Sequence, residues 1–202
     1  PVRVRHNTSG PGGYYEKWSA AMPERIEVTG EDAIFGLLNF ANGAVGQFVD
    51  NHAGHGAPLS FRHVFGTCGS ITPPGDRNGR PVRVVLDDGA DVTGDEVLDL
   101  VPEWRLDPVT ATLFGGERIA GYDFDFVTTD RKLLAVEYAE LANCVRHGTL
   151  PEVDGAVGRE AVALICALFE SQVAGRPVTL AEVRSGEVDA YQREIDQYYG
   201  LV

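Results

Sequence analysis

Apolar and polar residues alternate over short stretches in the first half of the chain, and turn-forming residues separate these stretches. This pattern is typical of β-strands. The clearest pair of strands covers residues 31–40 and 44–51, and Asn42-Gly43 between them favours a two-residue type I′ turn. We expect further strands at residues 1–5, 61–65, 70–72 and 82–86. Residues 87–128 fit no regular pattern, so we expect irregular structure there, with short strands near residues 117–119 and 124–127.

Helical periodicity dominates the second half. The spacing i, i+4, i+7, i+11 predicts a helix over residues 133–147 with one buried stripe, formed by Leu134, Tyr138, Leu141 and Val145. A second helix, over residues 156–174, is apolar almost all round from residue 161 to 169, so we expect most of its surface to be buried. Gly148 and Gly175 follow the two helices as caps.

The C-terminal residues 185–202 also have the pattern of an amphipathic helix. Ser185 is a favourable N-cap, and Gly200 ends the helix. Strands grouped before helices predict an α+β fold, namely an open-faced, mostly antiparallel β-sheet with helices packed on one face. We expect one domain over residues 1–202, with a loop-rich opening segment at 1–25 and the C-terminal helix at 185–202.

Composition narrows the range of functions. The formal net charge of −13 argues against a nucleic-acid surface or a polybasic membrane contact, and 44% hydrophobic residues is ordinary for a globular protein. Cys68, Cys144 and Cys166 are odd in number and widely spaced, so no disulfide framework is expected. We therefore predict a cytoplasmic protein with neither nucleic-acid nor membrane partners.

Several motifs of catalysis and nucleotide binding are missing from the sequence. It contains no GxGxxG turn, no GxxxxGK[ST] loop and no GxSxG nucleophile motif. We therefore expect no cofactor bound to this chain, and we assign no catalytic, cofactor-binding or metal-binding residue.

Two groups of residues are candidates for substrate binding. Polar side chains concentrate after the predicted hairpin, at Asn51, His52, His55, Arg62 and His63. Imidazole and amide groups both donate hydrogen bonds to sugar hydroxyls and accept them, and a guanidinium pairs with a carboxylate or phosphate. The alternatives are a solvated loop, or a zinc site of a hydrolase formed by His52, His55 and His63.

Aromatic residues form the second group, Tyr14, Tyr15 and Trp18, beside the turn-rich stretch HNTSGPGG. These rings are either an aromatic wall for a sugar or anchors that pin the segment to the core.

Five further stretches of sequence follow one another along the chain. These are TGEDAIFGLLNFANGAVGQF, then GTCGSI, and later LPEVDG, GREAVALICALFES and GRPVTL. Over roughly residues 26–182 the chain resembles the C-terminal domain of the Gfo/Idh/MocA oxidoreductases, the glucose-fructose oxidoreductase and inositol dehydrogenase group.

The resemblance implies a two-domain parent enzyme. Its N-terminal Rossmann domain binds NAD or NADP, its substrate is a sugar, inositol or related polyol, and the open sheet face commonly meets a second subunit. The family's Glu-Lys-Pro lysine and Asp-x-x-x-His histidine have no counterpart here, since Glu16-Lys17 is followed by Trp18.

We therefore expect this chain to be inactive alone and to contribute a substrate pocket and a subunit interface. Because the chain begins with Pro1 and its single methionine is Met22, we expect it to belong to a longer protein that supplies the Rossmann domain. The alternative is a standalone carbohydrate-binding or assembly module without redox activity.

Overall fold

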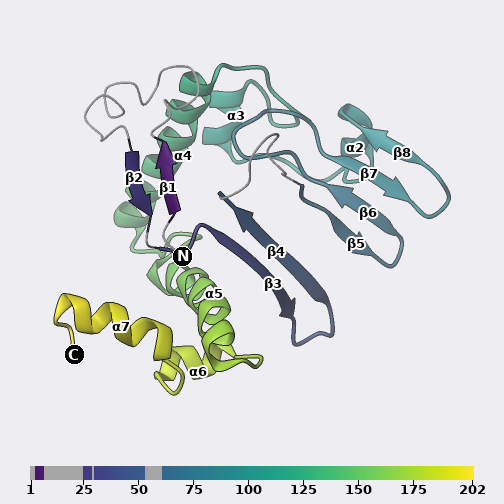
Figure 1. Cartoon of the computed structure of the whole chain (residues 1–202). Coiled ribbons are helices and arrows are strands. Elements are labelled where there is room, and N and C mark those ends of the chain that lie inside the picture. The colour runs from purple at the N-terminus through teal and green to yellow at the C-terminus, as the bar shows by residue number, and fades with distance from the viewer. Residues whose placement is uncertain (1–2, 7–24, 29, 53–60) are drawn as a thin grey trace. The chain divides into compact units, whose positions relative to one another are not determined.

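The computed structural model describes residues 3–6, 25–28, 30–52 and 61–202 (Figure 1). The chain forms two compact units: unit 1 comprises Pro1–Ala57 and Glu160–Val202, and unit 2 comprises Pro58–Arg159. All strand pairs of the described residues are antiparallel, and the helices follow the strands in sequence. The fold is therefore α+β, as predicted.

Unit 1 contains two antiparallel strand pairs. One consists of β1 (Arg3–His6) and β2 (Arg25–Val28), and the other of β3 (Ala33–Asn39) and β4 (Val45–Asn51). The register of the second pair sets Ala33 opposite Asn51 and Asn39 opposite Val45, so the predicted hairpin is confirmed.

The turn of this hairpin differs from the prediction. A type I′ turn needs positive φ at both central residues, but Gly43 has φ 86° and Asn42 does not have positive φ. The Gly43 amide instead donates to the Phe40 carbonyl at 2.9 Å, which makes a three-residue loop closed by a left-handed glycine. The longer loop lets the Asn42 side-chain oxygen accept from the Ala44 amide at 3.1 Å, a contact that stabilises the turn locally.

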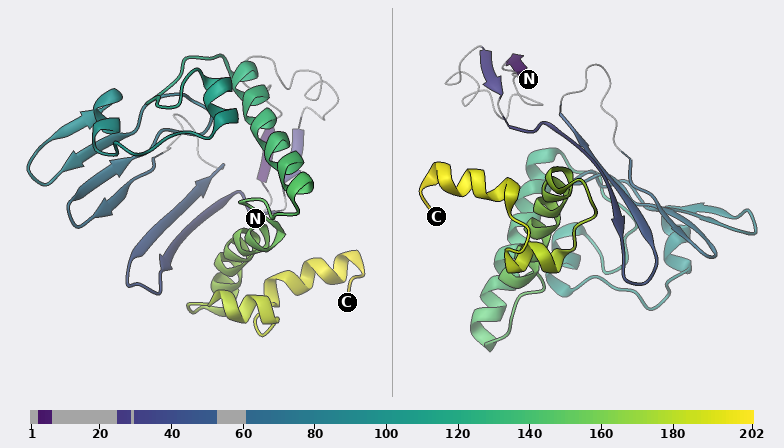
Figure 2. Two further views of the ribbon diagram at one scale, coloured as in Figure 1. Left: turned by 180° about the vertical axis from the view of Figure 1, so that it is seen from behind. Right: turned by 60° about the horizontal axis from the view of Figure 1, so that its bottom comes forward.

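The helices of unit 1 are the body of α5 (Gly155–Ala174), followed by α6 (Leu180–Ser185) and α7 (Ala190–Tyr199). Both views in Figure 2 show α5 beside the β3–β4 hairpin. The predicted helix over 156–174 is confirmed as α5. The predicted end of the C-terminal helix at Gly200 is also confirmed, because Gly200 has φ 66° and follows the last residue of α7. Ser185 was expected as an N-cap but is the last residue of α6, because Gly186 in the left-handed conformation ends that helix.

The expected burial of α5 holds in its middle, where residues 163–171 are all buried or half-buried, but not in its first two turns or its last turn. Ala163, Ala167 and Glu170 form a buried stripe, whereas Val162 is 64% exposed. The apolar residues of 164–169 off this stripe are half-buried.

Unit 2 contains a four-stranded sheet in the order β5 (Val64–Gly66), β6 (Gly69–Thr72), β7 (Arg83–Leu86) and β8 (Asp91–Thr93). The predicted strands at 61–65, 70–72 and 82–86 are thus present with shifted ends.

Three helices complete unit 2: α2 (Asp95–Asp99), α3 (Pro108–Phe114) and α4 (Phe126–His147). The short strands expected near 117–119 and 124–127 are absent from this described region, because Asp125 caps α4 and starts it well before residue 133. Gly148 ends α4 with φ 66°, as predicted.

The stripe on α4 that was predicted to be buried is exposed. The exposed fractions are 44% for Leu134, 70% for Tyr138, 54% for Leu141 and 78% for Val145. Helix α4 packs instead through another face, on which Thr129 and Cys144 are buried and Leu133 and Val136 are half-buried. Helical periodicity marks an apolar face but does not say what covers it.

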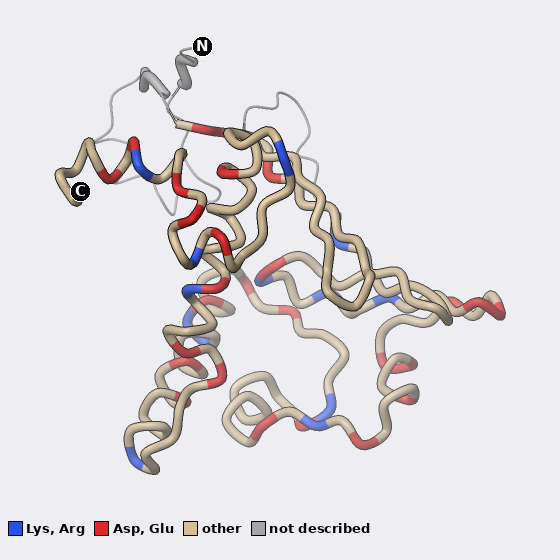
Figure 3. Tube along the Cα trace, turned by 90° about the horizontal axis from the view of Figure 1, so that it is seen from below, with Lys and Arg blue, Asp and Glu red and all other residues tan. Residues whose placement is uncertain are grey.

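Charged residues are interspersed along the described chain. Figure 3 shows Asp and Glu on helices and loops alike, with fewer Lys and Arg residues between them. In the parts of the chain that the structure describes, no helix is both long and apolar enough to cross a membrane.

Candidate functional site

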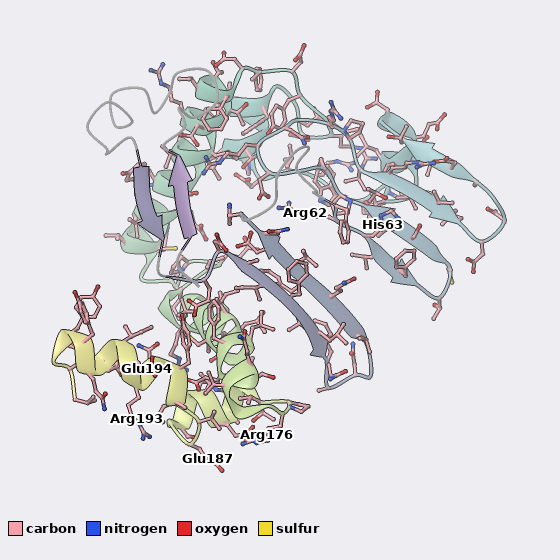
Figure 4. The ribbon with its side chains drawn as sticks, viewed as in Figure 1. Arg62, His63, Arg176, Glu187, Arg193 and Glu194 are labelled. Atoms are coloured by element: carbon pink, nitrogen blue, oxygen red, sulfur yellow. The ribbon has the colours of Figure 1, made fainter. Side chains whose placement is uncertain are left out.

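Four of the eight predicted substrate-binding residues lie among the described residues. Asn51 and His52 end β4 in unit 1, and Arg62 and His63 precede β5 in unit 2 (Figure 4). The other four lie outside the described residues, namely Tyr14, Tyr15, Trp18 and His55.

The end of β4 places His52 beside a carboxylate. The backbone amide of His52 donates to the Asp32 carbonyl at 2.7 Å, which continues the hairpin by one bond beyond Asn51. The Nε2 atom of His52 is 3.1 Å from Asp50 Oδ1, and both side chains are exposed. This pair offers a hydrogen-bond donor and an acceptor side by side, the combination that a sugar hydroxyl can use.

Arg62 forms a bidentate pair with Asp76 in the loop between β6 and β7. Both guanidinium–carboxylate distances, Nη1–Oδ1 and Nη2–Oδ2, are 2.6 Å. Hydrogen bonding to Arg62 holds the pKa of Asp76 below its usual value, and the same bond raises the pKa of Arg62. An anionic ligand at Arg62 therefore has to compete with an internal carboxylate.

Sequence reasoning missed Asp76. It belongs to the turn-rich stretch PPGDRNGRP, whose composition is typical of a solvated connection between strands. Its separation of 14 residues from Arg62 gives no periodic signal.

The β5–β6 pairing holds His63 opposite Thr72. The register joins Val64 to Ile71, and the next position outward brings the Thr72 hydroxyl to 3.2 Å from His63 Nδ1. The imidazole also lies against the Phe65 ring, with centroids 4.9 Å apart. His63 and Thr72 thus present an exposed ring and a hydroxyl from two hydrogen-bonded strands.

A metal centre has no support in the described part of the chain, where no group of three or more His, Cys, Asp or Glu residues is arranged to hold an ion. Because His55 lies outside the described residues, the alternative of a zinc site formed by His52, His55 and His63 stays untested.

The described residues do not fit a dinucleotide. Their strand pairs are all antiparallel, whereas a Rossmann cradle needs a parallel βαβ unit. Gly94 does link β8 to α2, but α2 has five residues and carries Asp95 and Glu96 in its first turn, which would repel a pyrophosphate.

Comparison with known protein families identifies the chain's family. Residues 5–180 match the family model described as "Oxidoreductase family, C-terminal alpha/beta domain". No curated protein and no solved structure matches the chain.

Proposed function

Because the chain belongs to the Gfo/Idh/MocA oxidoreductase family as its C-terminal alpha/beta domain, we propose that it is the substrate-binding and subunit-joining part of an NAD(P)-dependent sugar or polyol dehydrogenase. The observation that carries this proposal is the family match, which extends over residues 5–180. The proposal treats residues 1–202 as one functional part of a longer cytoplasmic enzyme.

The candidate substrate-binding residues in this proposal are polar side chains at the end of β4 in unit 1 and, separately, just before β5 in unit 2. Two observations support it: His52 lies beside Asp50, and His63 lies beside Thr72. Both pairs combine donors with acceptors, which suits the hydroxyl groups of a polyol. Asn51, Arg62 and the residues that lie outside the described structure, Tyr14, Tyr15, Trp18 and His55, complete the proposed set.

Hydride transfer in this proposal belongs to the N-terminal domain, since the described residues offer no dinucleotide cradle. In the bound state NAD or NADP supplies the hydride chemistry, while residues of this chain bind and orient the polyol. The 202-residue chain by itself is then inactive.

The subunit interface in this proposal is the face of the β3–β4 hairpin turned away from α5. Phe35, Leu37 and Val45 are exposed by 69%, 71% and 68% on that face. Such a concentration of large apolar side chains on one strand pair is typical of a surface that a second protein covers. The partner in this proposal is a second copy of the chain.

Calorimetry with the 202-residue chain tests the proposal. We expect no binding of NAD(H) or NADP(H), and weak saturable binding of one or more compounds from a panel of sugars and inositols. His63→Ala should weaken that binding. His147→Ala, which removes an imidazole from the last residue of α4, should not. Tight nucleotide binding by the chain would contradict the assignment of the cofactor to another domain.

A further inference from the structure

Unit 2 contains a cavity that neither the predicted substrate residues nor the family match accounts for. Its volume is about 570 Å³, within the range of roughly 300–1,000 Å³ typical of small-molecule sites. The loop at 73–82 forms one side, and α3, α4 and the loop at 119–122 form the others. All lining residues belong to unit 2, so the cavity is complete within that unit.

Aromatic rings form much of the wall. Trp104, Phe114 and Tyr122 line the cavity, and the Phe114 and Tyr122 rings meet edge to face with centroids 5.1 Å apart. Behind them, Tyr122 stacks on Phe124 at 5.4 Å, and Lys132 Nζ lies 4.5 Å from the Phe124 centroid. These contacts fix the rings before any ligand arrives.

Backbone contacts hold the 73–82 loop against this aromatic wall. The Tyr122 amide donates to the Gly79 carbonyl at 2.9 Å. A Cβ atom at Gly79 would lie 2.0 Å from the backbone carbonyl oxygen of Tyr122, and one at Gly121 would lie 2.5 Å from the backbone carbonyl oxygen of Gly79. The two segments approach so closely only because both positions are glycine, and the cavity is therefore preformed.

Two arginines of the 73–82 loop, Arg77 and Arg80, line the cavity, and they differ in their contacts. Arg77 pairs with Asp130 at 3.1 Å, and Asp76 is neutralised by Arg62 at 2.6 Å. Arg80 also lines the cavity and is exposed, and its side chain makes neither an ion pair nor a hydrogen bond with any residue that the structure describes. Of the arginines that line the cavity, Arg77 has a carboxylate partner and Arg80 has none among the described residues.

We propose that this cavity binds a small aromatic monocarboxylate, with its ring against Trp104 and Tyr122 and its carboxylate on Arg80. The aromatic wall selects a flat ring, and a guanidinium pairs with a carboxylate through two parallel hydrogen bonds. Arg80 is the one described cation of the lining without a carboxylate partner, which matches one negative charge, and much of the remaining wall is apolar, through residues such as Leu106, Ile119 and Leu133. This inference goes beyond the proposed dehydrogenase role and needs no residue from another domain.

Fluorescence of Trp104 provides the test. The chain has two tryptophans, so Trp18→Phe leaves Trp104 as the sole emitter. The full chain with this change is titrated with benzoate and phenylacetate, which do not emit in the tryptophan range, and in parallel with their neutral amides. We expect saturable changes, with the carboxylates binding about tenfold more tightly than the amides, as one charge-assisted pair provides.

Two variants and one control assign the binding to the cavity. Arg80→Ala should weaken carboxylate binding about tenfold and leave amide binding unchanged. Val136→Phe, which fills the cavity from α4, should remove both, with circular dichroism confirming that the chain stays folded. Arg131→Ala removes an exposed charge on the same helix outside the cavity and should change nothing. The proposal is overturned if no compound gives a saturable change, if amides bind as tightly as carboxylates, or if Arg80→Ala leaves carboxylate binding intact.

Discussion

Single glycines mark places of close packing inside each of the two units. Gly36 in β3 faces α5, where an added Cβ would lie 2.5 Å from Leu168 Cδ2. Gly69 in β6 has φ 149°, and its Cβ would lie 2.2 Å from the Val85 oxygen. Both glycines belong to the stretches that resemble the family, so the resemblance has a physical basis in close backbone approach.

Replacement of Gly36 by alanine is expected to destabilise unit 1. The methyl group overlaps the end of the Leu168 side chain, which has to shift within the packed face, so the loss should be about 1 kcal/mol of unfolding free energy in urea denaturation. Gly30→Ala is the matched control, because nothing lies within 4 Å of an added Cβ there. Equal stability of the two variants would show that Leu168 moves aside without strain.

At the residue scale, the sequence indicated which side chains can bind a ligand but not which residues they contact in the fold. Arg62 was expected to meet an external anion, yet Asp76 already occupies its guanidinium. The pairing depends on the path of the 73–82 loop, which amino-acid propensities do not encode. Arg80 was missed for the same reason, since only the folded loop places it beside Trp104 and Tyr122.

Helix α7 is anchored by a buried carboxylate. Glu170 on α5 is only 1% exposed and accepts hydrogen bonds from the Tyr191 and Gln192 amides at 3.1 and 3.0 Å. These amides belong to the first turn of α7, so the negative charge lies at the positive end of the helix dipole. The neighbouring Ser171 hydroxyl donates to the Arg176 carbonyl at 2.7 Å and closes the turn after α5.

Glu170→Ala is therefore expected to release α7. It leaves two amide donors without their acceptor, at a cost of about 1–3 kcal/mol each when they stay buried. Hydrogen exchange should accelerate over the first turn of α7, and the urea midpoint should fall. Glu194→Ala, on the exposed surface of α7 (Figure 4), should leave both unchanged. Slow exchange in Glu170→Ala would mean that packing alone holds the helix.

The start of α6 should depend on acid pH. Thr179 and Glu182 form a capping box, and Arg176 lies 2.8 Å from Glu182. The hydrogen bond from the Thr179 amide, with those of Arg176 and the Thr179 hydroxyl, lowers the pKa of Glu182 to about 2 from 4.5. Since the folded pKa lies below the unfolded one, the stabilisation is complete above pH 4.5 and disappears as the pH falls towards 2.

Thermal unfolding of Glu182→Gln tests this dependence. The variant should have a lower Tm than the original chain at pH 7, and the two should converge as the pH approaches 2. Glu187→Gln, an exposed change in the next turn (Figure 4), should match the original chain at every pH. A Tm difference for Glu182→Gln that persists undiminished in acid would exclude the carboxylate as its cause.

Long elements with clear caps were predictable, and short ones were not. Gly148 and Gly200 mark the ends of α4 and α7 in the sequence as they do in the structure. Helices α2 and α3 span five and seven residues, too few for a helical period to emerge from the sequence. Their signal was local: Asp107 followed by Pro108 is a capping residue before a favoured first helical residue.

The whole molecule exposes more apolar surface than the sequence suggested. The apolar stripe of α4 is accessible, and so are Phe35 and Leu37 on the hairpin and Phe65 on β5. Fold class was readable because strand and helix patterns occupy separate halves of the chain. The sequence could not show which apolar faces are buried inside a unit, because a face that packs in a core and a face that meets another protein have the same apolar periodicity.

Self-association should depend on the exposed face of the hairpin. We expect the chain to sediment as a dimer at micromolar concentration and Leu37→Lys to shift it to a monomer, because a charge at the centre of the apolar face is unfavourable when buried. Val162→Lys places the same charge at a 64% exposed position on α5 and should leave the dimer intact. A monomeric original chain, or equal behaviour of the two variants, would contradict this interface.

The division of the chain also sets an order of folding. Unit 2 is one continuous segment, so it can close as soon as that segment has been synthesised. Unit 1 must wait, because the Tyr191 hydroxyl that donates to Glu31 lies 160 residues further along the chain. Until α5 and α7 emerge, the β3–β4 hairpin stands without its helical cover and is open to pairing with other nascent chains. Slow translation after residue 159 should therefore favour aggregation, and a chaperone that shields the hairpin should relieve it.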